Sequence, residues 1–395
     1  MKEKIKKLRR YPFLVVFVAF MLVVFCADML TTRRQYSELE NRTLKQRPDF
    51  SLKSLVENEY TLEYEEFVND QFVLRDQWIT LKSVAESALG KIENNGVAYG
   101  KEHYLFGKTT QTDQQQVDRN VSYVNQFISG YDGDVTFGVI PNSYAILTDK
   151  LPVGLENINI DQKSLIPQLQ QQVQGENLNT LELLPVMESH SQEEIYYHTD
   201  HHWTTLGAWY AYEAYAQSRG LAYGSLEEME AWKQAVPDFY GTYFSKSKNF
   251  DAQPDTIYWY DFPVTDATID GKYTLPTSDG GEIPVEGMYN VSQFSQRDKY
   301  AAFLYGNNGL TVIKSENNKN HQDGVTSRVL LIKDSYGNSL APFLTWSYDE
   351  VYVVDLRALP MTMSQLLEQT EFDDVLILYN YESFQLDRNV VRLIA

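Results

Sequence analysis

The run Val329-Leu330-Leu331-Ile332-Lys333-Asp334-Ser335 decides the fold class. Four apolar residues followed by polar ones are typical of a strand that is buried on both faces of a parallel sheet. Similar apolar runs stand at 135–140, 351–354 and 375–378. The segments around them have helical length or periodicity, most clearly at 111–130 and 162–175. This alternation predicts a three-layer α/β/α fold, in which helices cover both faces of a parallel sheet.

The strand–helix pattern breaks between 237 and 325, where Tyr, Phe, Gly, Asn and Asp are frequent and short runs such as 256–260 alternate. We expect a β-rich insertion there. It divides the α/β domain into a first part at 96–236 and a second part at 326–395. Residues 31–95 precede the domain as a membrane-proximal helical segment, with two helices expected within 52–90.

The N-terminus has the pattern of a membrane anchor. Residues 1–10 carry six Lys or Arg, and residues 13–27 are uncharged and almost wholly apolar. Phe25 occupies a position where a signal-peptide cleavage site requires a small residue. We therefore expect residues 1–30 to form a basic cytoplasmic tail and an uncleaved, single-pass transmembrane signal-anchor, with the remainder outside the cytoplasm.

Charge and cysteine content agree with an exported domain. The chain has a net charge of −20, which argues against nucleic acid or an anionic membrane surface as a partner. The single cysteine, Cys26, lies in the apolar segment. The exported part must therefore be stable without a disulfide.

Histidines are concentrated in one short stretch. Three of the six in the chain fall within His198-Thr199-Asp200-His201-His202-Trp203. Thr204 and Gly220 then have the positions of an N-cap and a C-terminal glycine around a helix. If the stretch is extended, Asp200 and His202 point to the same face and His201 points away.

Ser335 follows the buried run at 329–332, so it lies at the carboxyl edge of the sheet, where open α/β sheets place their active sites. A serine becomes a nucleophile when a base and an orienting carboxylate accompany it. The Asp-x-His pair at 200 and 202 has both kinds of group, so Ser335 is a candidate nucleophile. Backbone N–H groups around Ser335 and Tyr336 would bind an oxyanion. Lys333 replaces the first glycine of a Gly-x-Ser-x-Gly elbow, so this is a different turn.

Further residues at the same edge complete the candidate pocket: Tyr336, Asn338, Arg357, Tyr379 and Asn380. Each candidate also has a purely structural interpretation. Ser335 could cap a helix that starts near Ser339, and Arg357 could pair with a surface carboxylate. Tyr379 and Asn380 could simply end a strand. Asp200 and its histidines could form a hydrogen-bonded turn.

Metal ligation is a further alternative. His198 and Asp200 have the spacing of a metal pair, with His321 as a distant third ligand. Because no matching distal motif is present, we expect no metal and no cofactor.

Asp200-His201-His202-Trp203 resembles the motif that names the DHHW family. That family is similar to the SGNH-like, alginate-type enzymes that O-acetylate polysaccharides, in which an Asp-x-His pair precedes the serine. Weaker matches are Glu40-Asn41-Arg42, the hairpin at 96–106, Gly241-Thr242 and Asp355-x-Arg357.

The resemblance implies an SGNH-hydrolase-like domain that O-acetylates a polysaccharide of the bacterial cell envelope through a triad. Carried over by position, Ser335 would be the nucleophile, His202 the base and Asp200 the group that orients the imidazole. A membrane-bound O-acyltransferase would be the partner that supplies the acetyl group. Two alternatives remain open: a polysaccharide O-acetylesterase with the same triad, and a non-catalytic cell-surface protein that binds glycans or assists assembly.

Overall fold

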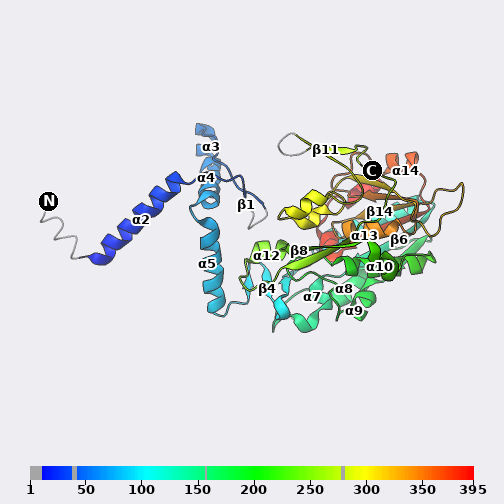
Figure 1. Ribbon diagram of the computed structural model, residues 1–395, viewed down its shortest axis with the longest axis horizontal. Helices are drawn as coiled ribbons and strands as arrows, with labels where there is room; N and C mark the ends of the chain where they lie inside the picture. The colour runs from blue at the N-terminus through cyan, green and yellow to red at the C-terminus, as the bar shows by residue number, and fades with distance from the viewer. Residues whose placement is uncertain (1–10, 38–41, 156–157, 277–280) are drawn as a thin grey trace. The chain divides into compact units, whose positions relative to one another are not determined.

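The computed structural model describes residues 11–37, 42–155, 158–276 and 281–395 (Figure 1). The chain divides into an N-terminal unit, residues 1–91 with 248–250, and a main unit, residues 92–247 with 251–395. The basic segment at 1–10 and the family-like Glu40 and Asn41 lie outside the described residues.

The N-terminal unit is mostly helical. Its first described helix, α2 (Pro12–Leu30), has 19 residues and a mean hydropathy of 2.8, and none of its residues is buried. Within the described part of the chain it is the one helix long and apolar enough to cross a membrane. The short hairpin β1 (Tyr36–Ser37) and β2 (Arg42–Thr43) follows.

Three helices occupy the region where the sequence predicts two: α3 (Leu52–Val56), α4 (Glu59–Gln71) and α5 (Arg75–Ala88). The prediction missed the break at Asn58, whose φ of 64° is left-handed and ends the regular helix. Leu74, with φ 55°, makes the second break.

The main unit is built on a sheet of seven strands in the order β10-β13-β15-β14-β16-β6-β7. The strands are β6 (Asp134–Ile140), β7 (Leu178–Leu181), β10 (Asp266–Ile269), β13 (Leu310–Lys314), β14 (Arg328–Lys333), β15 (Glu350–Val354) and β16 (Asp374–Asn380). The five strands from β15 to β7 are parallel, whereas β13 and β10 pair antiparallel at the other edge. The sheet is therefore mixed rather than wholly parallel, because two strands from the predicted insertion extend it.

Alternation along the central strands divides the core into two hydrophobic clusters. In β14, Val329 and Leu331 enter one cluster while Leu330 and Ile332 enter the other. The first cluster is covered by α7 (Ser143–Ile146), α9 (Leu183–Ser189), α10 (Thr205–Arg219) and α13 (Gly337–Leu344). The second is covered by α6 (Gln114–Gly130), α8 (Gln162–Gln172), α14 (Met363–Gln369) and α15 (Tyr381–Leu386). Each buried Leu, Ile or Val contributes about 1.5–3 kcal/mol.

Smaller elements surround this sheet. The predicted hairpin at 96–106 is present as β4 (Val97–Tyr99) and β5 (Leu105–Gly107), with β3 (Glu93–Asn94) beside it. β8 (Lys233–Phe239) pairs with β9 (Asp255–Tyr260), and β11 (Thr274–Pro276) with β12 (Glu282–Pro284). The short helices α11 (Leu226–Met229), α12 (Thr242–Ser247) and a 3-10 turn at Lys299–Ala302 complete this part of the chain.

The two turns that carry the candidate site have clear local causes. α10 begins at an N-cap, Thr204, whose hydroxyl accepts from Gly207 N, and ends at Gly220 with φ 66°, as the sequence predicts. α13 begins at Gly337, two residues before the predicted start. Asp334 explains the earlier start, because its carboxylate accepts from Tyr336 N at 2.9 Å and its carbonyl accepts from Gly337 N at 3.1 Å.

Candidate active site

A buried tryptophan, Trp203, fixes the histidine loop, residues 198–203, to the turn that carries Ser335. Tyr196 and Trp203 form an isolated bridge that closes the base of the loop. The indole Nε1 of Trp203 donates to Tyr336 O at 3.0 Å and to Ser339 Oγ at 2.9 Å. A buried indole N–H needs such acceptors. The side chain of Trp203 therefore sets the loop against the turn that carries Ser335.

Asp200, His202 and Ser335 form one hydrogen-bonded line. Ser335 Oγ lies 2.7 Å from His202 Nε2, and His202 Nδ1 lies 2.6 Å from Asp200 Oδ1. Asp200 is buried, with 2% of its surface exposed, and its carboxylate accepts a hydrogen bond from Nδ1–H of His202. This bond fixes the tautomer and leaves Nε2 as the acceptor for the serine hydroxyl. The structure thus brings together three residues that are up to 135 positions apart in the chain.

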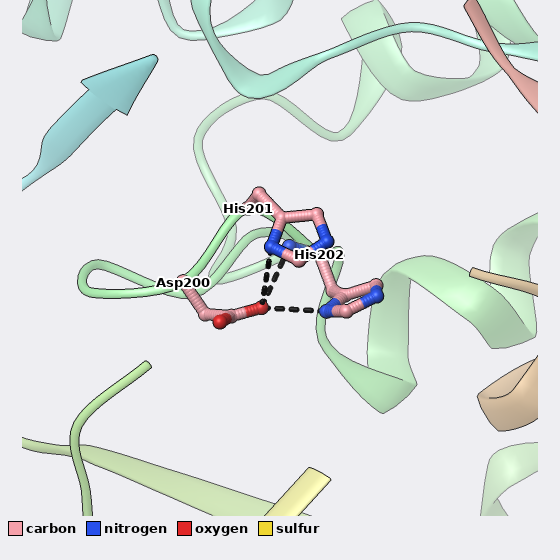
Figure 2. A group of neighbouring side chains, drawn as sticks. All are labelled: Asp200, His201 and His202. Carbon is pink, nitrogen blue, oxygen red and sulfur yellow. Dashed lines mark hydrogen bonds and ion pairs between the residues drawn. The ribbon is translucent and has the colours of Figure 1, made fainter. Parts of the chain in front are cut away.

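His201 does not point away from this line, and the sequence prediction for it is wrong. Its ring lies 3.8 Å from that of His202, and its Nδ1 is 3.5 Å from Asp200 Oδ1 (Figure 2). The prediction assumed an extended strand. Instead, Asp200 Oδ1 accepts from His202 N at 3.0 Å, which is the bond of an Asx turn. The backbone therefore turns, and strand alternation no longer applies.

The carboxylate of Asp200 is held from a second segment. Thr242 N, at the start of α12, donates to Asp200 Oδ2 at 2.7 Å. A Cβ at Gly241 would overlap Cβ and Oδ2 of Asp200, so only glycine fits there. The Gly241-Thr242 pair noted in the sequence therefore packs against Asp200 and holds its carboxylate in place.

Tyr300 covers the imidazole of His202, and sequence analysis did not identify it. Its ring stacks on His202 at 3.9 Å with an interplanar angle of 11°. Its hydroxyl donates to Ser335 O at 3.1 Å. The only sequence signal for Tyr300 was the general aromatic content of the insertion, which does not single out one tyrosine.

The electrostatics of the two histidines differ. Burial disfavours charge on His202 and the neighbouring His201 adds to this, so the pKa of His202 falls to about 4 despite Asp200. Burial also opposes charge on His201, but Asp200 outweighs it and raises the pKa of His201 above its ordinary value. Although burial favours the neutral acid, the two imidazoles hold the pKa of Asp200 well below its ordinary value. At neutral pH, His202 is therefore the uncharged imidazole that a general base requires.

The predicted oxyanion donors are only partly available. Tyr336 N–H already donates to Asp334 Oδ1, so it is not free for a substrate oxygen. Within the described residues, no group accepts from Ser335 N–H, which remains the backbone donor beside the nucleophile. The hydroxyl of Tyr336 donates to His201 O and supports the histidine loop instead.

The other candidate pocket residues make structural contacts. Arg357 pairs with Asp355, Nη2 to Oδ2, at 2.5 Å, and Asn380 caps α15 through Glu382 N at 3.0 Å. Tyr379 belongs to the cluster of the opposite sheet face together with Phe384. Asn338 Nδ2 donates to Asn307 Oδ1 at 3.1 Å, while its own Oδ1 is buried with no partner in the described part of the chain. Within the described residues, no hydrogen bond joins these four side chains to Ser335 Oγ.

Metal ligation was the alternative interpretation of this loop. His198 bonds to Asp255 and His321 to Asp349, so the anticipated set of His198, Asp200 and His321 is not assembled. Asp200, His201 and His202 do place ligand atoms within 4.8 Å of one another. However, His202 Nδ1 is bonded to Asp200 and Nε2 to Ser335 Oγ, so neither nitrogen offers a free lone pair. These atoms fit a hydrogen-bonded triad better than a metal ion.

The fold and this site define an α/β protein with an Asp-His-Ser hydrogen-bonded line at the carboxyl edge of its sheet. A family model described as "DHHW protein" matches residues 89–354, and the chain belongs to this family. A search of curated proteins found no match.

Two solved structures share the fold. A DHHW family protein from Eubacterium siraeum is 25% identical with a TM-score of 0.60, over 77% of this chain and 96% of that one. PatB1 from Bacillus cereus, solved with a sulfonyl adduct, is 18% identical with a TM-score of 0.56, over 74% of this chain and 97% of that one. The family resemblance seen in the sequence is therefore confirmed.

Proposed function

We propose that the protein transfers an acyl group through Ser335 and O-acetylates a polysaccharide outside the cytoplasm. The observation that carries the proposal is the line of two short hydrogen bonds, 2.7 Å from Ser335 Oγ to His202 Nε2 and 2.6 Å from His202 Nδ1 to Asp200 Oδ1. A hydroxyl bonded to a neutral, oriented imidazole is an activated nucleophile.

In the first half-reaction, Ser335 Oγ attacks the carbonyl carbon of an acetyl ester while His202 Nε2 takes the serine proton. Ser335 N–H donates to the oxyanion. The carbon–oxygen bond to the donor then breaks, His202 returns the proton to the leaving oxygen, and acetyl-Ser335 remains.

In the second half-reaction, a sugar hydroxyl attacks the acetyl carbon and gives its proton to His202. Collapse of the second oxyanion releases the O-acetylated sugar, and His202 returns the proton to Ser335 Oγ. Asp200 stabilises the imidazolium in both halves and stays ionised. With water in place of the sugar, the same steps describe an esterase.

The setting of this chemistry is also part of the proposal. The helix α2 is long and apolar enough to anchor the protein as a single-pass membrane protein. A membrane-bound O-acyltransferase that passes acetyl groups outward is the fitting donor, since acetyl-coenzyme A is a cytoplasmic metabolite. The two core clusters on opposite sheet faces support a three-layer, SGNH-like arrangement.

The test is hydrolysis of a chromogenic acetyl ester together with labelling by a sulfonyl fluoride. Ser335→Ala should abolish labelling, and Asp200→Asn should reduce the rate by ~10²–10⁴-fold, because the tautomer of His202 is lost. Ser129→Ala, which removes an exposed hydroxyl on α6, is the matched control and should change neither readout.

Equal rates and equal labelling for wild type and Ser335→Ala would contradict the proposal and favour a non-catalytic protein. Acetyl groups that appear on an oligosaccharide acceptor identify the transferase. Free acetate as the sole product, with every acceptor tried, identifies the esterase.

A further inference from the structure

The corner where α4 ends and α5 begins exposes three large apolar side chains. Phe72, Leu74 and Trp78 are 39%, 59% and 40% exposed, and we call them the apolar corner. Leu74 also has a left-handed φ of 55°, a conformation that glycine or asparagine adopts at lower cost. An exposed leucine with this backbone is unfavourable in water both through its side chain and through its φ. A neighbour that covers the apolar corner would remove the first of these costs.

Hydrogen bonds fasten this corner to the C-terminal end of α2. Val73 N donates to Asp28 Oδ1 at 3.0 Å, and Arg33 Nη1 donates to Gln71 O at 3.0 Å. The buried side chain of Gln71 accepts from Arg34 N at 2.9 Å and donates to Arg34 O at 2.7 Å. These segments belong to the same unit of the chain. The apolar corner therefore lies beside the last turn of α2.

The uncharged part of α2 is short for a membrane span. Residues 12–27 rise about 24 Å at 1.5 Å per residue, whereas the hydrocarbon core of a bilayer is ~30 Å thick. Asp28 follows directly, and its carboxylate is paired with Arg33 at 3.4 Å. A span shorter than the core is accommodated when the bilayer thins or when flanking groups complete the apolar surface. The apolar corner supplies such groups at the level where the uncharged run ends.

We propose that the apolar corner inserts into the outer interfacial layer of the membrane that α2 spans, so that its partner is the lipid surface. Phe72 and Leu74 extend the apolar surface of α2 beyond Ala27. Trp78 has the amphipathic side chain that is enriched at this level of a membrane. The inference rests on the anchor in the proposed function, because the corner has lipid beside it only when α2 is in the membrane.

Charge favours lipid over a second copy of the chain as the partner. α4 has no basic residue and five acidic ones: Glu59, Glu63, Glu65, Glu66 and Asp70. Packing of α4 against a second copy would bring these like charges together, which disfavours a dimer through this surface. At the corner, by contrast, Arg34 pairs with Asp76 at 2.7 Å. Paired charges enter a headgroup layer at lower cost than single ones.

The experiment measures the depth of Leu74 in phosphatidylcholine liposomes that contain the full chain. A fluorophore is attached to Leu74→Cys in a Cys26→Ser background, since Cys26 is the only cysteine in the sequence. We expect strong quenching by lipid with a nitroxide on its headgroup and weak quenching by lipid with a nitroxide at the end of its acyl chain. Glu59→Cys, an exposed position at the other end of α4, is the control and should be quenched less by the headgroup nitroxide.

Two results would overturn the proposal. The first is equal quenching of the labels at Leu74 and Glu59 by the headgroup nitroxide. The second is a label at Leu74 that neither the lipid nitroxides nor aqueous iodide quench, because a second copy or another protein surface would then cover the corner.

Bilayer thickness tests whether the corner completes the span. Phe72→Ser with Leu74→Asn should lower incorporation of the full chain into thick dierucoyl phosphatidylcholine liposomes severalfold. Incorporation into thin dimyristoyl liposomes should stay at the wild-type level, which also shows that the variant folds. Leu62→Asn, at an exposed leucine on α4 outside the corner, is the matched control and should incorporate as the wild type does in both. Equal incorporation of the double variant and the wild type in the thick bilayer would refute this contribution.

Failure of this inference is distinguishable from failure of the proposed function. A wild type that does not float with liposomes contradicts the anchor and the corner together. A wild type that floats, with an unquenched label at Leu74, contradicts the corner alone. Ester hydrolysis that is independent of Ser335 contradicts the catalytic proposal and leaves the corner standing.

Discussion

Two imidazoles in tilted contact share one carboxylate in this site. The pKa of the more exposed one, His201, is raised, and the pKa of His202 is lowered. His201 has a side chain 33% exposed, whereas His202 lies between Tyr300 and Ser335. A proton on His201 therefore lowers the pKa of His202, the proposed base beside it. This role is electrostatic. The sequence prediction, in which His201 points away from the site, did not include it.

The pH profile tests this coupling. The proposed mechanism requires neutral His202, so with a pKa of about 4 the kcat/KM of the wild type should stay level from pH 7 to about 5 and fall below that. His201→Ala removes a cause that lowers this pKa, so the acid limb should move to higher pH. Superimposable profiles of wild type and His201→Ala would contradict the coupling. His321→Ala, a distant histidine paired with Asp349, is the control.

Gly241 makes a second prediction at the residue scale. Gly241→Ala would push the new Cβ into Asp200 and move the carboxylate that orients His202. A displacement of about 1 Å at such a group can cost ~10²-fold in rate. We expect that loss in ester hydrolysis with a far smaller change in thermal stability. Gly130→Ala, where the Cβ meets open space, should be neutral in both measurements, and equal rates for the two variants would exclude the steric argument.

Among the elements, α10 determines where the histidine loop ends. Thr204 caps the helix by accepting from Gly207 N at 3.3 Å, and its hydroxyl donates to Glu194 O at 2.6 Å across the loop base. Both bonds are made by one hydroxyl group, so the start of the helix and the closure of the loop depend on the same side chain.

Removal of this hydroxyl should have a measurable cost. Thr204→Ala should lower the free energy of unfolding by about 1 kcal/mol, the usual effect of losing a Thr N-cap. Urea denaturation measures it as a lower midpoint with an unchanged slope. Thr204→Ser keeps the hydroxyl and should restore most of the loss. An alanine variant as stable as the wild type would show that the cap contributes nothing.

At the scale of the whole molecule, the long apolar helix α2 predicts an anchored protein. Wild type should fractionate with membranes and should retain the N-terminus that precedes Asp28. The double variant Val16→Lys, Val23→Lys adds about 2.5–3.5 kcal/mol of insertion cost for each lysine and should leave the membrane fraction. Val16→Leu, Val23→Leu should remain in it. A soluble wild-type product that begins near Asp28 would instead indicate a cleaved signal peptide.

Local patterns predicted the central strands and the bounds of α10 correctly. The apolar runs became β6, β14, β15 and β16, since four or more buried β-formers in a row have few alternatives. Thr204 and Gly220 bound α10 because capping involves only residues within one turn. The start of α13 was misjudged, because the turn before it is held by Asp334, which accepts from Tyr336 N and also from Asn380 N at 2.9 Å at the end of another strand.

The sequence by itself determined the α/β class, the family motif and the identity of the three residues proposed as a triad, because these follow from periodicity and from neighbours along the chain. Only the tertiary structure decided what surrounds them. Tyr300 reaches His202 from nearly a hundred residues away, and Gly241 lies beneath Asp200 from another segment. Such contacts depend on how separate segments pack, and packing is not encoded in the spacing of residues along one segment.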